Sequence, residues 1–195
     1  MKKGVVIGLV ISLLGIARAG ELRPYVRAGL GPMITEDSEA SGSSYPAGSE
    51  IQFDLGFTVS GAVGVECENC PVRAELEYNF VKYYSDEANF AGFRDGNKLV
   101  WHVFMANFYY DFKNDSLITP FVTAGLGYTL EESDVDAVLA YQFGGGLAFE
   151  MTEKTSLDVA YRYFTVEDPE FTSPAGNYEA EFVNHLLMFG LRYTF

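Results

Sequence analysis

Two cysteines separated by two residues are the first candidates for chemistry in this 195-residue chain. They lie in the segment Cys67-Glu68-Asn69-Cys70-Pro71, and their spacing suits a redox pair, half of a metal site or a small disulfide. The sequence offers no second Cys or His pair for zinc and no βαβ pattern for a thioredoxin-like site. In an oxidising compartment the motif favours a disulfide across a tight turn, with free thiols as the alternative.

Charged residues give the chain a strongly acidic character. It has 13 basic and 27 acidic residues, a formal net charge of −14 at pH 7. This balance excludes nucleic-acid binding, which requires a basic surface. The acids gather in four groups without the spacing of an EF-hand loop, so solvated loops are favoured over cation sites and no metal or cofactor is expected. The groups are Glu36, Asp37 and Glu39; Asp86, Glu87 and Asp95; Glu132, Asp134 and Asp136; and Glu167, Asp168 and Glu170.

The first 19 residues have the pattern of a secretory signal peptide. A basic start, Met1-Lys2-Lys3, precedes an apolar run from Gly4 to Ala17 and the A-x-A motif of residues 17–19. We expect cleavage after Ala19 or one residue later, which leaves residues 20–195 as one exported domain with a formal charge of −17. No apolar run reaches the length of a spanning helix.

The mature chain divides into eight segments, each long enough for a tilted membrane strand. Short and longer connections alternate between them, as in antiparallel barrels with short periplasmic turns and long external loops. An even number of strands places both termini on the periplasmic side. The expected strands are 22–34, 51–66, 71–84, 98–112, 119–131, 137–151, 156–167 and 179–195.

The closing segment carries the strongest alternation of large apolar residues. Phe189, Leu191, Tyr193 and the terminal Phe195 share one face, while smaller or polar residues occupy the positions between them. A terminal aromatic has little to pack against in water, whereas it suits a membrane boundary. A strand of a soluble sandwich is the alternative.

Alternation also places charged residues on the inner face of the expected barrel. An eight-stranded barrel has room only for its own side chains, so these charges must pair. We expect a packed, polar lumen held together by a structural charge network, with a gated ion path as the alternative. The expected members are Arg27, Arg73, Glu75, Glu77, Asp111, Glu150, Asp158, Arg162 and Arg192.

The fifth expected strand repeats the first. Residues 23–32 align without a gap to residues 119–128, an offset of one half-barrel, although no other strands visibly align. Both copies contain a glycine pair that we expect to face inward, where side chains from across the lumen need room.

These features resemble the small eight-stranded outer-membrane β-barrels, namely the opacity-type surface antigens and the transmembrane domain of outer membrane protein A. The residues that carry the resemblance are the Pro-aromatic-Val-x-Ala-Gly-Leu-Gly strands at 24–31 and 120–127, segments 73–78 and 105–112, and the C-terminal strand. The resemblance implies an all-β, up-and-down barrel in the bacterial outer membrane. It also implies lipid and lipopolysaccharide as surroundings and recognition of Phe189, Leu191, Tyr193 and Phe195 by the barrel-assembly machinery.

For function, the resemblance implies an opacity- or adhesin-like surface protein rather than an enzyme. A narrow channel for small solutes is the alternative. A monomer is expected because closure of the barrel leaves no exposed edges. A lipid A-modifying enzyme is disfavoured because neither His102 nor His185 has a nearby nucleophile. Asn184 and Glu181 lie near His185, but Leu187 stands where a His-x-Ser arrangement would have its serine.

Overall fold

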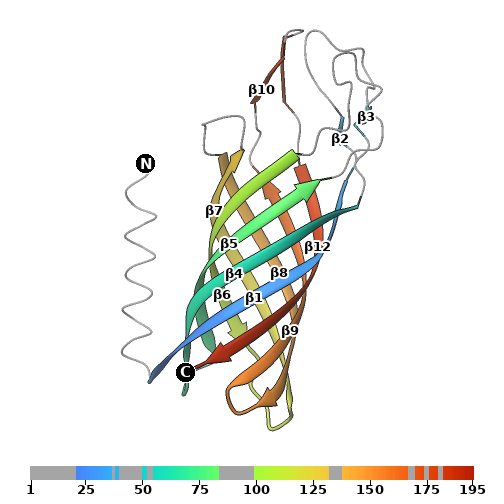
Figure 1. Cartoon of the computed structure of the whole chain (residues 1–195). Helices are drawn as coiled ribbons and strands as arrows, with labels where there is room; N and C mark the ends of the chain where they lie inside the picture. The colour runs from blue at the N-terminus through green and yellow to red at the C-terminus, as the bar shows by residue number, and fades with distance from the viewer. Residues whose placement is uncertain are drawn as a thin grey trace.

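Eight antiparallel strands form a closed barrel (Figure 1). A computed structural model describes residues 21–36, 38–39, 50–51, 55–83, 99–131, 138–166, 170–173, 176–179 and 182–195; the expected signal peptide lies outside these ranges. Around the barrel the order is β1, β12, β9, β8, β7, β6, β5, β4, and β4 pairs again with β1. The strands are β1 (Leu22–Thr35), β4 (Gly56–Cys67), β5 (Val72–Tyr83), β6 (Leu99–Asp111), β7 (Ile118–Glu131), β8 (Val138–Thr152), β9 (Thr155–Val166) and β12 (Phe182–Thr194).

The expected all-β barrel of eight strands is confirmed, and most strand limits lie within one residue of the expected ones. Two strands begin later than expected, because parts of their segments form separate two-stranded sheets. Glu50–Ile51 is β3, which pairs with β2 (Ser38–Glu39), so that β4 begins only at Gly56. Glu179 ends β11 (Gly176–Glu179), which pairs with β10 (Glu170–Ser173), and β12 begins at Phe182.

The two ends of the barrel differ in their connections. At one end, where β1 begins and β12 stops, the strands are joined by the short segments 68–71, 112–117 and 153–154. We call this the terminal end and the opposite one the loop end. The loop end contains the breaks in the described chain and both small sheets (Figure 1). Closure leaves each of the eight strands with a partner on both sides, so the barrel has no exposed edge.

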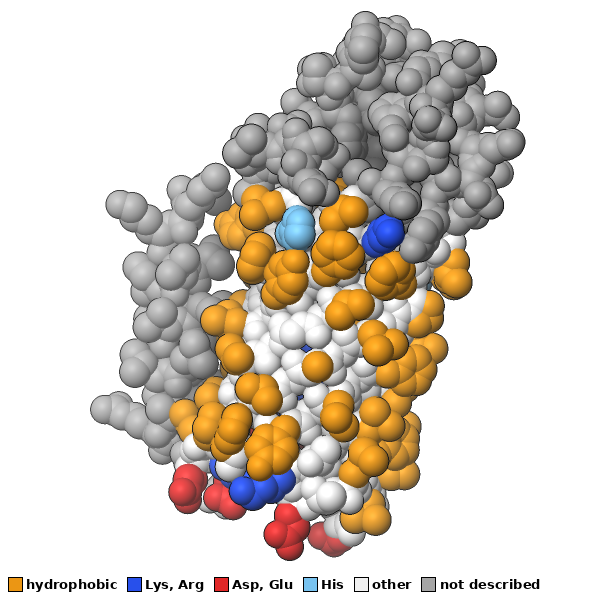
Figure 2. All heavy atoms as spheres, in the orientation of Figure 1, with side chains coloured by type: hydrophobic (Ala, Val, Ile, Leu, Met, Phe, Trp, Pro, Cys, Tyr) orange, Lys and Arg blue, Asp and Glu red, His pale blue; other side chains and the backbone are white. Residues whose placement is uncertain are grey.

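Side chains alternate between a buried inner face and an exposed outer face along each strand. On β1, Tyr25, Arg27 and Met33 are buried, whereas Leu30 and Ile34 are about three-fifths exposed. Apolar side chains cover much of the outer surface in Figure 2. An apolar outside is the reverse of a soluble protein's pattern and suits contact with lipid. Among the described residues, no helix has the length and hydropathy needed to cross a membrane.

Both glycine pairs of the repeated strands face inward, as expected. Gly29 and Gly31 on β1 and Gly125 and Gly127 on β7 are all buried. A methyl group at Gly31 would overlap the backbone carbonyl of Leu187 on β12. Gly31 therefore permits close approach of β1 to β12, the pair that closes the barrel.

We predict that Gly31→Ala lowers the free energy of unfolding by about 2 kcal/mol, because the neighbouring backbone must move to make room. Gly61→Ala is the matched control, since a methyl group there would meet nothing within 4 Å. Urea unfolding of both variants in phospholipid vesicles, followed by heat-modifiable gel mobility, gives the measurement. Equal stability of the two variants would contradict this role of Gly31.

Candidate functional site

Glu77 is the centre of a buried charge cluster inside the barrel. Its carboxylate accepts hydrogen bonds from Arg27 Nη2 at 2.5 Å, from Arg162 Nη1 at 2.8 Å and from Asn107 Nδ2 at 2.6 Å. The Glu77 side chain is fully buried, and those of both arginines are 3% exposed. A carboxylate without water is stable only with such partners, so Glu77 depends on donors from several strands.

Glu75 lies two residues away on the same face of β5 and shares the Arg27 guanidinium, at 2.9 Å from Nη2. Neutral donors complete its shell: the hydroxyls of Tyr25 and Tyr109 donate at 3.0 and 2.5 Å, and Asn107 Nδ2 donates at 3.2 Å. These neutral donors allow two acids to share a site with two arginines without further charges. We call Arg27, Glu75, Glu77 and Arg162, with these donors, the central cluster.

A second cluster lies nearer the terminal end. Arg73 binds Asp111 through two nitrogens, at 2.8 Å from both Nε and Nη2, and its Nη1 is 3.6 Å from Asp158. Arg192 contacts Asp158 at 3.4 Å and Glu66 at 2.6 Å. The Arg73 guanidinium also lies over the Tyr109 ring, 4.4 Å from its centroid, which links this terminal-end cluster to the central one.

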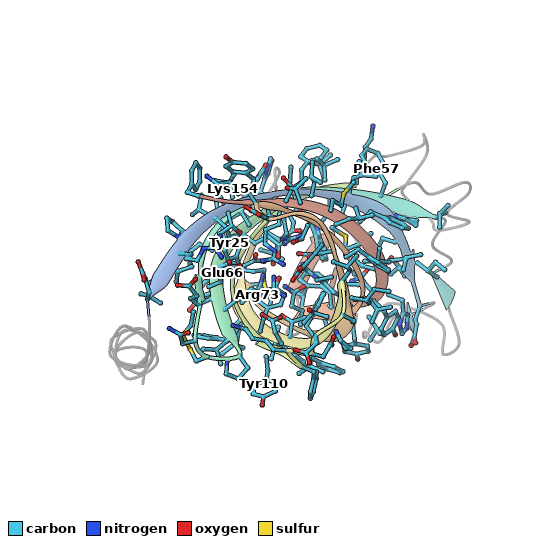
Figure 3. All side chains as sticks on the ribbon, turned by 90° about the horizontal axis from the view of Figure 1, so that it is seen from below. Tyr25, Phe57, Glu66, Arg73, Tyr110 and Lys154 are labelled. Carbon is cyan, nitrogen blue, oxygen red and sulfur yellow. A yellow bond between two sulfur atoms is a disulfide. The ribbon has the colours of Figure 1, made fainter. Side chains whose placement is uncertain are left out.

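Two of these contacts join opposite walls of the barrel. Strands β5 and β9 are four places apart in the ring of eight. Arg162 on β9 nevertheless reaches Glu77 on β5, and Arg73 on β5 reaches Asp158 on β9. Viewed from below in Figure 3, Tyr25, Glu66 and Arg73 point into the barrel while Tyr110 points outward. Charged side chains therefore bridge the lumen at two levels.

The structure places all but one of the charged residues expected in the lumen within these two clusters. Glu150 is the exception and requires a correction, because its side chain is exposed. It lies at the terminal end of β8, where the pairing with β9 shifts register between Glu150 and Thr152. Glu150 itself still pairs regularly with Ser156, so its exposure follows from its place at the end of the strand, where the barrel opens to solvent.

Sequence reasoning missed Glu66 and the neutral partner Tyr25, and the inward position of Gln142 gave no indication of its contact with Asn107. Glu66 is the last residue but one of β4 and continues the inward positions of that strand, where it contacts Arg192. Gln142 Nε2 donates to Asn107 Oδ1 at 2.6 Å, which orients the amide toward both acids. For Tyr25 the sequence shows only an aromatic residue at an inward position. It does not indicate the partner, Glu75, which is 50 residues away.

The lumen is polar only in part, which corrects the expectation of a polar interior. Toward the loop end the inward positions are apolar on several strands and form one packed cluster with residues lower in the barrel. The signal was present in the sequence, since these inward positions are Trp, Val, Met and Leu. The loop-end members include Met33, Val81, Trp101, Val103, Leu186 and Met188.

Cys67 and Cys70 form a disulfide at the terminal end, in the turn between β4 and β5. Lys113 Nζ donates to the carbonyl oxygens of Cys67 and Glu68 at 3.0 and 2.7 Å, and Glu68 N donates to Glu21 O at 3.0 Å. The turn thereby connects the start of β1 to the segment that follows β6.

The two histidines face outward near the loop end. Nδ1 of His102 is 2.7 Å from the Tyr78 hydroxyl, and Nδ1 of His185 is 2.6 Å from the Tyr161 hydroxyl. Asn184 is buried on the inner face, where its Oδ1 accepts from Thr35. It is therefore separated from His185 by the sheet itself. Glu181 lies outside the described residues.

The four residues expected to be read during assembly all lie on the exposed face. Phe189, Leu191, Tyr193 and Phe195 are 40–61% exposed, and Phe195 N donates to Pro24 O at 3.0 Å. Of the acidic groups, Glu36 contacts His185. The side chains of the others lie outside the described part of the chain.

We predict that Glu77→Ala lowers the free energy of unfolding by about 3–5 kcal/mol, because it leaves Arg27 and Arg162 buried without their shared carboxylate. Glu150→Ala removes an acid of the same type from an exposed site and should change stability by less than about 0.5 kcal/mol. Urea titration of both barrels in vesicles compares them directly. If both variants lost a similar amount of unfolding free energy, the central cluster would have no special role in stability.

Loss of the disulfide should have a smaller effect. Closing so short a loop restricts the unfolded chain only modestly, so a Cys67→Ser, Cys70→Ser double variant should lose about 2 kcal/mol of unfolding free energy. Dithiothreitol should lower the urea midpoint of the native protein to that of the double variant. It should leave the midpoint of the double variant unchanged. A shift in the double variant would assign the effect of the reductant to something other than this bond.

Comparison with known proteins identifies the fold family. A family model described as outer membrane protein beta-barrel domain matches residues 6–195. No curated protein matches the chain significantly. Among solved structures, OprG from Pseudomonas aeruginosa is similar with a TM-score of 0.61 at 11% identity, covering 88% of this chain and 95% of OprG. Neisserial surface protein A gives 0.59 at 18% identity, covering 88% and 97%, and outer membrane protein AlkL gives 0.55 at 14%, covering 90% and 92%.

At these identities the solved structures support the fold alone, and the family match covers nearly the whole chain. The apolar outer face and the closed ring of eight strands agree with both comparisons. The chain belongs to the outer membrane protein beta-barrel domain family and is a β-barrel of the bacterial outer membrane.

Proposed function

We propose that this protein is a non-enzymatic surface barrel, closed to ions, whose external loops contact other molecules in an opacity- or adhesin-like role. In this proposal the terminal end faces the periplasm and the loop end faces outward. The short connections at the terminal end support that orientation, because barrels of this family have short periplasmic turns and longer external loops.

The main support for a closed lumen is the contact of Arg162 with Glu77 across the barrel, at 2.8 Å. An ion that passes this level must separate a buried ion pair and replace its hydrogen bonds, which is costly in a region without water. The contact of Arg73 with Asp158 presents a second barrier nearer the terminal end. Eight strands leave no width for a path around these side chains.

The apolar packing toward the loop end supports the same conclusion. Met33, Trp101 and Leu186 are at most 6% exposed and belong to one packed cluster. Apolar constrictions exclude ions because they offer nothing to replace the hydration shell. A solute that enters from the loop end therefore meets this apolar packing before it reaches the charged clusters.

Closure of the lumen leaves the surface as the functional part. Four acidic groups fall in the segments that join strands at the loop end. Their charge favours partners with basic surfaces or bridging cations over anionic partners. Among the described residues, His102 and His185 hydrogen-bond to tyrosine hydroxyls rather than to a serine, which supports a non-enzymatic role.

We also propose that the barrel-assembly machinery recognises the outward face of β12 before closure. Phe189, Leu191, Tyr193 and Phe195 form one exposed row that ends at the chain terminus. Their side chains take no part in the lumen clusters, so a partner could bind them before β1 pairs with β12.

Planar-bilayer recording tests the closed lumen, after gel mobility has verified folding. The native barrel should give no single-channel steps. A Glu77→Ala, Arg162→Ala double variant removes both members of the cross-lumen pair and leaves Arg27 to bind Glu75, so brief conducting events are expected. Glu150→Ala should stay silent. Steady, salt-dependent steps from the native barrel would refute the closed lumen and favour a narrow solute channel.

A further inference from the structure

The two halves of the barrel are related by a repeat that extends beyond the first and fifth barrel strands. An offset of 83 residues aligns β5 and β6 with β9 and β12 without a gap. The strand registers obey the same offset: Phe80 pairs with His102, and Tyr163 pairs with His185. This corrects the expectation that no other strands align. The identical positions are Tyr78/Tyr161, Val100/Val183, His102/His185, Met105/Met188, Tyr110/Tyr193 and Phe112/Phe195.

The repeat places two equivalent Tyr–His pairs on opposite sides of the barrel, because β5 and β6 lie opposite β9 and β12 in the ring. In both pairs the hydroxyl lies 2.6–2.7 Å from Nδ1. The rings are stacked at centroid distances of 6.0 and 5.9 Å. A second aromatic ring, Phe80 or Tyr163, contacts each imidazole edge-on at 5.8 Å.

Contacts at His185 define which nitrogen donates. Its Nε2 is 2.7 Å from Glu36 Oε1. An ionised carboxylate only accepts hydrogen bonds, so Nε2 carries a proton there. In the neutral ring Nδ1 then accepts from the Tyr161 hydroxyl. The pair therefore presents an outward N–H donor, and an anionic oxygen occupies it.

His102 has the same geometry but different surroundings. Lys82 is a diagonal neighbour on β5, because Lys82 pairs with Val100 and Phe80 pairs with His102. The corresponding residue in the other half is Thr165. The His102 pair thus combines the donor geometry that binds a carboxylate at His185 with an additional positive charge.

Both pairs lie where the apolar outer face ends. His102 is opposite Leu130, the last residue but one of β7, and the loop end begins just beyond it. Figure 2 shows a histidine and a basic side chain among apolar groups at this end of the barrel. Tyrosine and basic side chains at this depth meet lipid headgroups rather than acyl chains.

We propose that Tyr78, His102 and Lys82 form a binding site for a phosphate group of an outer-leaflet lipid. His102 Nε2 donates to a phosphate oxygen, Lys82 supplies charge, and the outward rings of Phe80 and Phe104 contact the adjoining chains. Glu36 fills the equivalent position at His185. Assignment to the outer leaflet rests on the orientation proposed above. By the repeat offset of 96 residues, Glu132 is the sequence equivalent of Glu36, which contacts His185. Glu132 lies outside the described residues, so the test includes a variant of it.

Native mass spectrometry of lipid retained by the folded barrel tests this site. Vesicles of phosphatidylcholine with a minor fraction of bisphosphorylated lipid A supply the ligand, and lipid A stripped of both phosphates is the chemical control. The native barrel should retain one lipid A. His102→Phe should weaken retention about tenfold or more, since one charge-assisted hydrogen bond is lost. His185→Phe, the matched change in the other half, should leave it unchanged.

Glu36→Ala provides a gain-of-binding measurement that misfolding cannot imitate. It exposes the donor at His185 and should raise the number of retained lipids from one to two. Equal retention of the dephosphorylated lipid, equal effects of the two histidine variants, or displacement by inorganic phosphate would each overturn the proposal. If the barrel retained lipid A at the His102 site only after Glu132→Ala, the proposal would also be overturned. Glu132 would then be the residue that accepts the hydrogen bond from His102 in the native protein. Because lipid A is present in both leaflets of these vesicles, a negative result leaves the orientation and the loop function untouched.

Discussion

Enclosure of charge in a narrow barrel is the constraint on which the rest of the structure depends. Glu75 and Glu77 have no access to water, so donors from neighbouring and opposite strands must surround them. Space for those donors comes from glycine: a methyl group at Gly190 would lie 3.0 Å from Arg27 Nη1, and one at Gly29 would lie 3.2 Å from it. Glycine at these positions therefore serves the charge cluster as well as the backbone.

The same clusters show that the two halves are not interchangeable. In the repeat, Glu77 corresponds to Ala160 and Asn79 corresponds to Arg162, so an acid in one half meets an arginine in the other. Two copies of the first half would bring further acids into one lumen and would lack Arg162. The inward residues of the two halves therefore differ in such a way that each half supplies charges that the other lacks within one chain.

Alternation along the strands was enough to predict the barrel, its eight strands and the faces of Arg73, Glu75 and Arg162. A period of two determines which residues are enclosed, whatever their partners are. Partner identity depends on strand order and tilt, which no local pattern encodes. Tyr25 and Glu75 are 50 residues apart, and Glu77 and Arg162 are 85 apart. Glu150 was placed wrongly because a period of two does not show that an inward position at the end of a strand lies at the exposed rim of the barrel.

The alternation also separates the packing of the lumen from the contacts of the outer surface at the loop end. Asn184 faces inward, where Thr35 donates to it, while the next residue, His185, faces outward to Tyr161 and Glu36. Because adjacent residues serve opposite faces, a change on the outer face leaves the packing of the lumen intact. The outer faces of the two halves have indeed diverged, with Lys82 in one and Thr165 in the other, although the Tyr–His geometry is the same in both. A barrel of this kind can therefore acquire new surface contacts while the buried charges that hold its walls together remain unchanged.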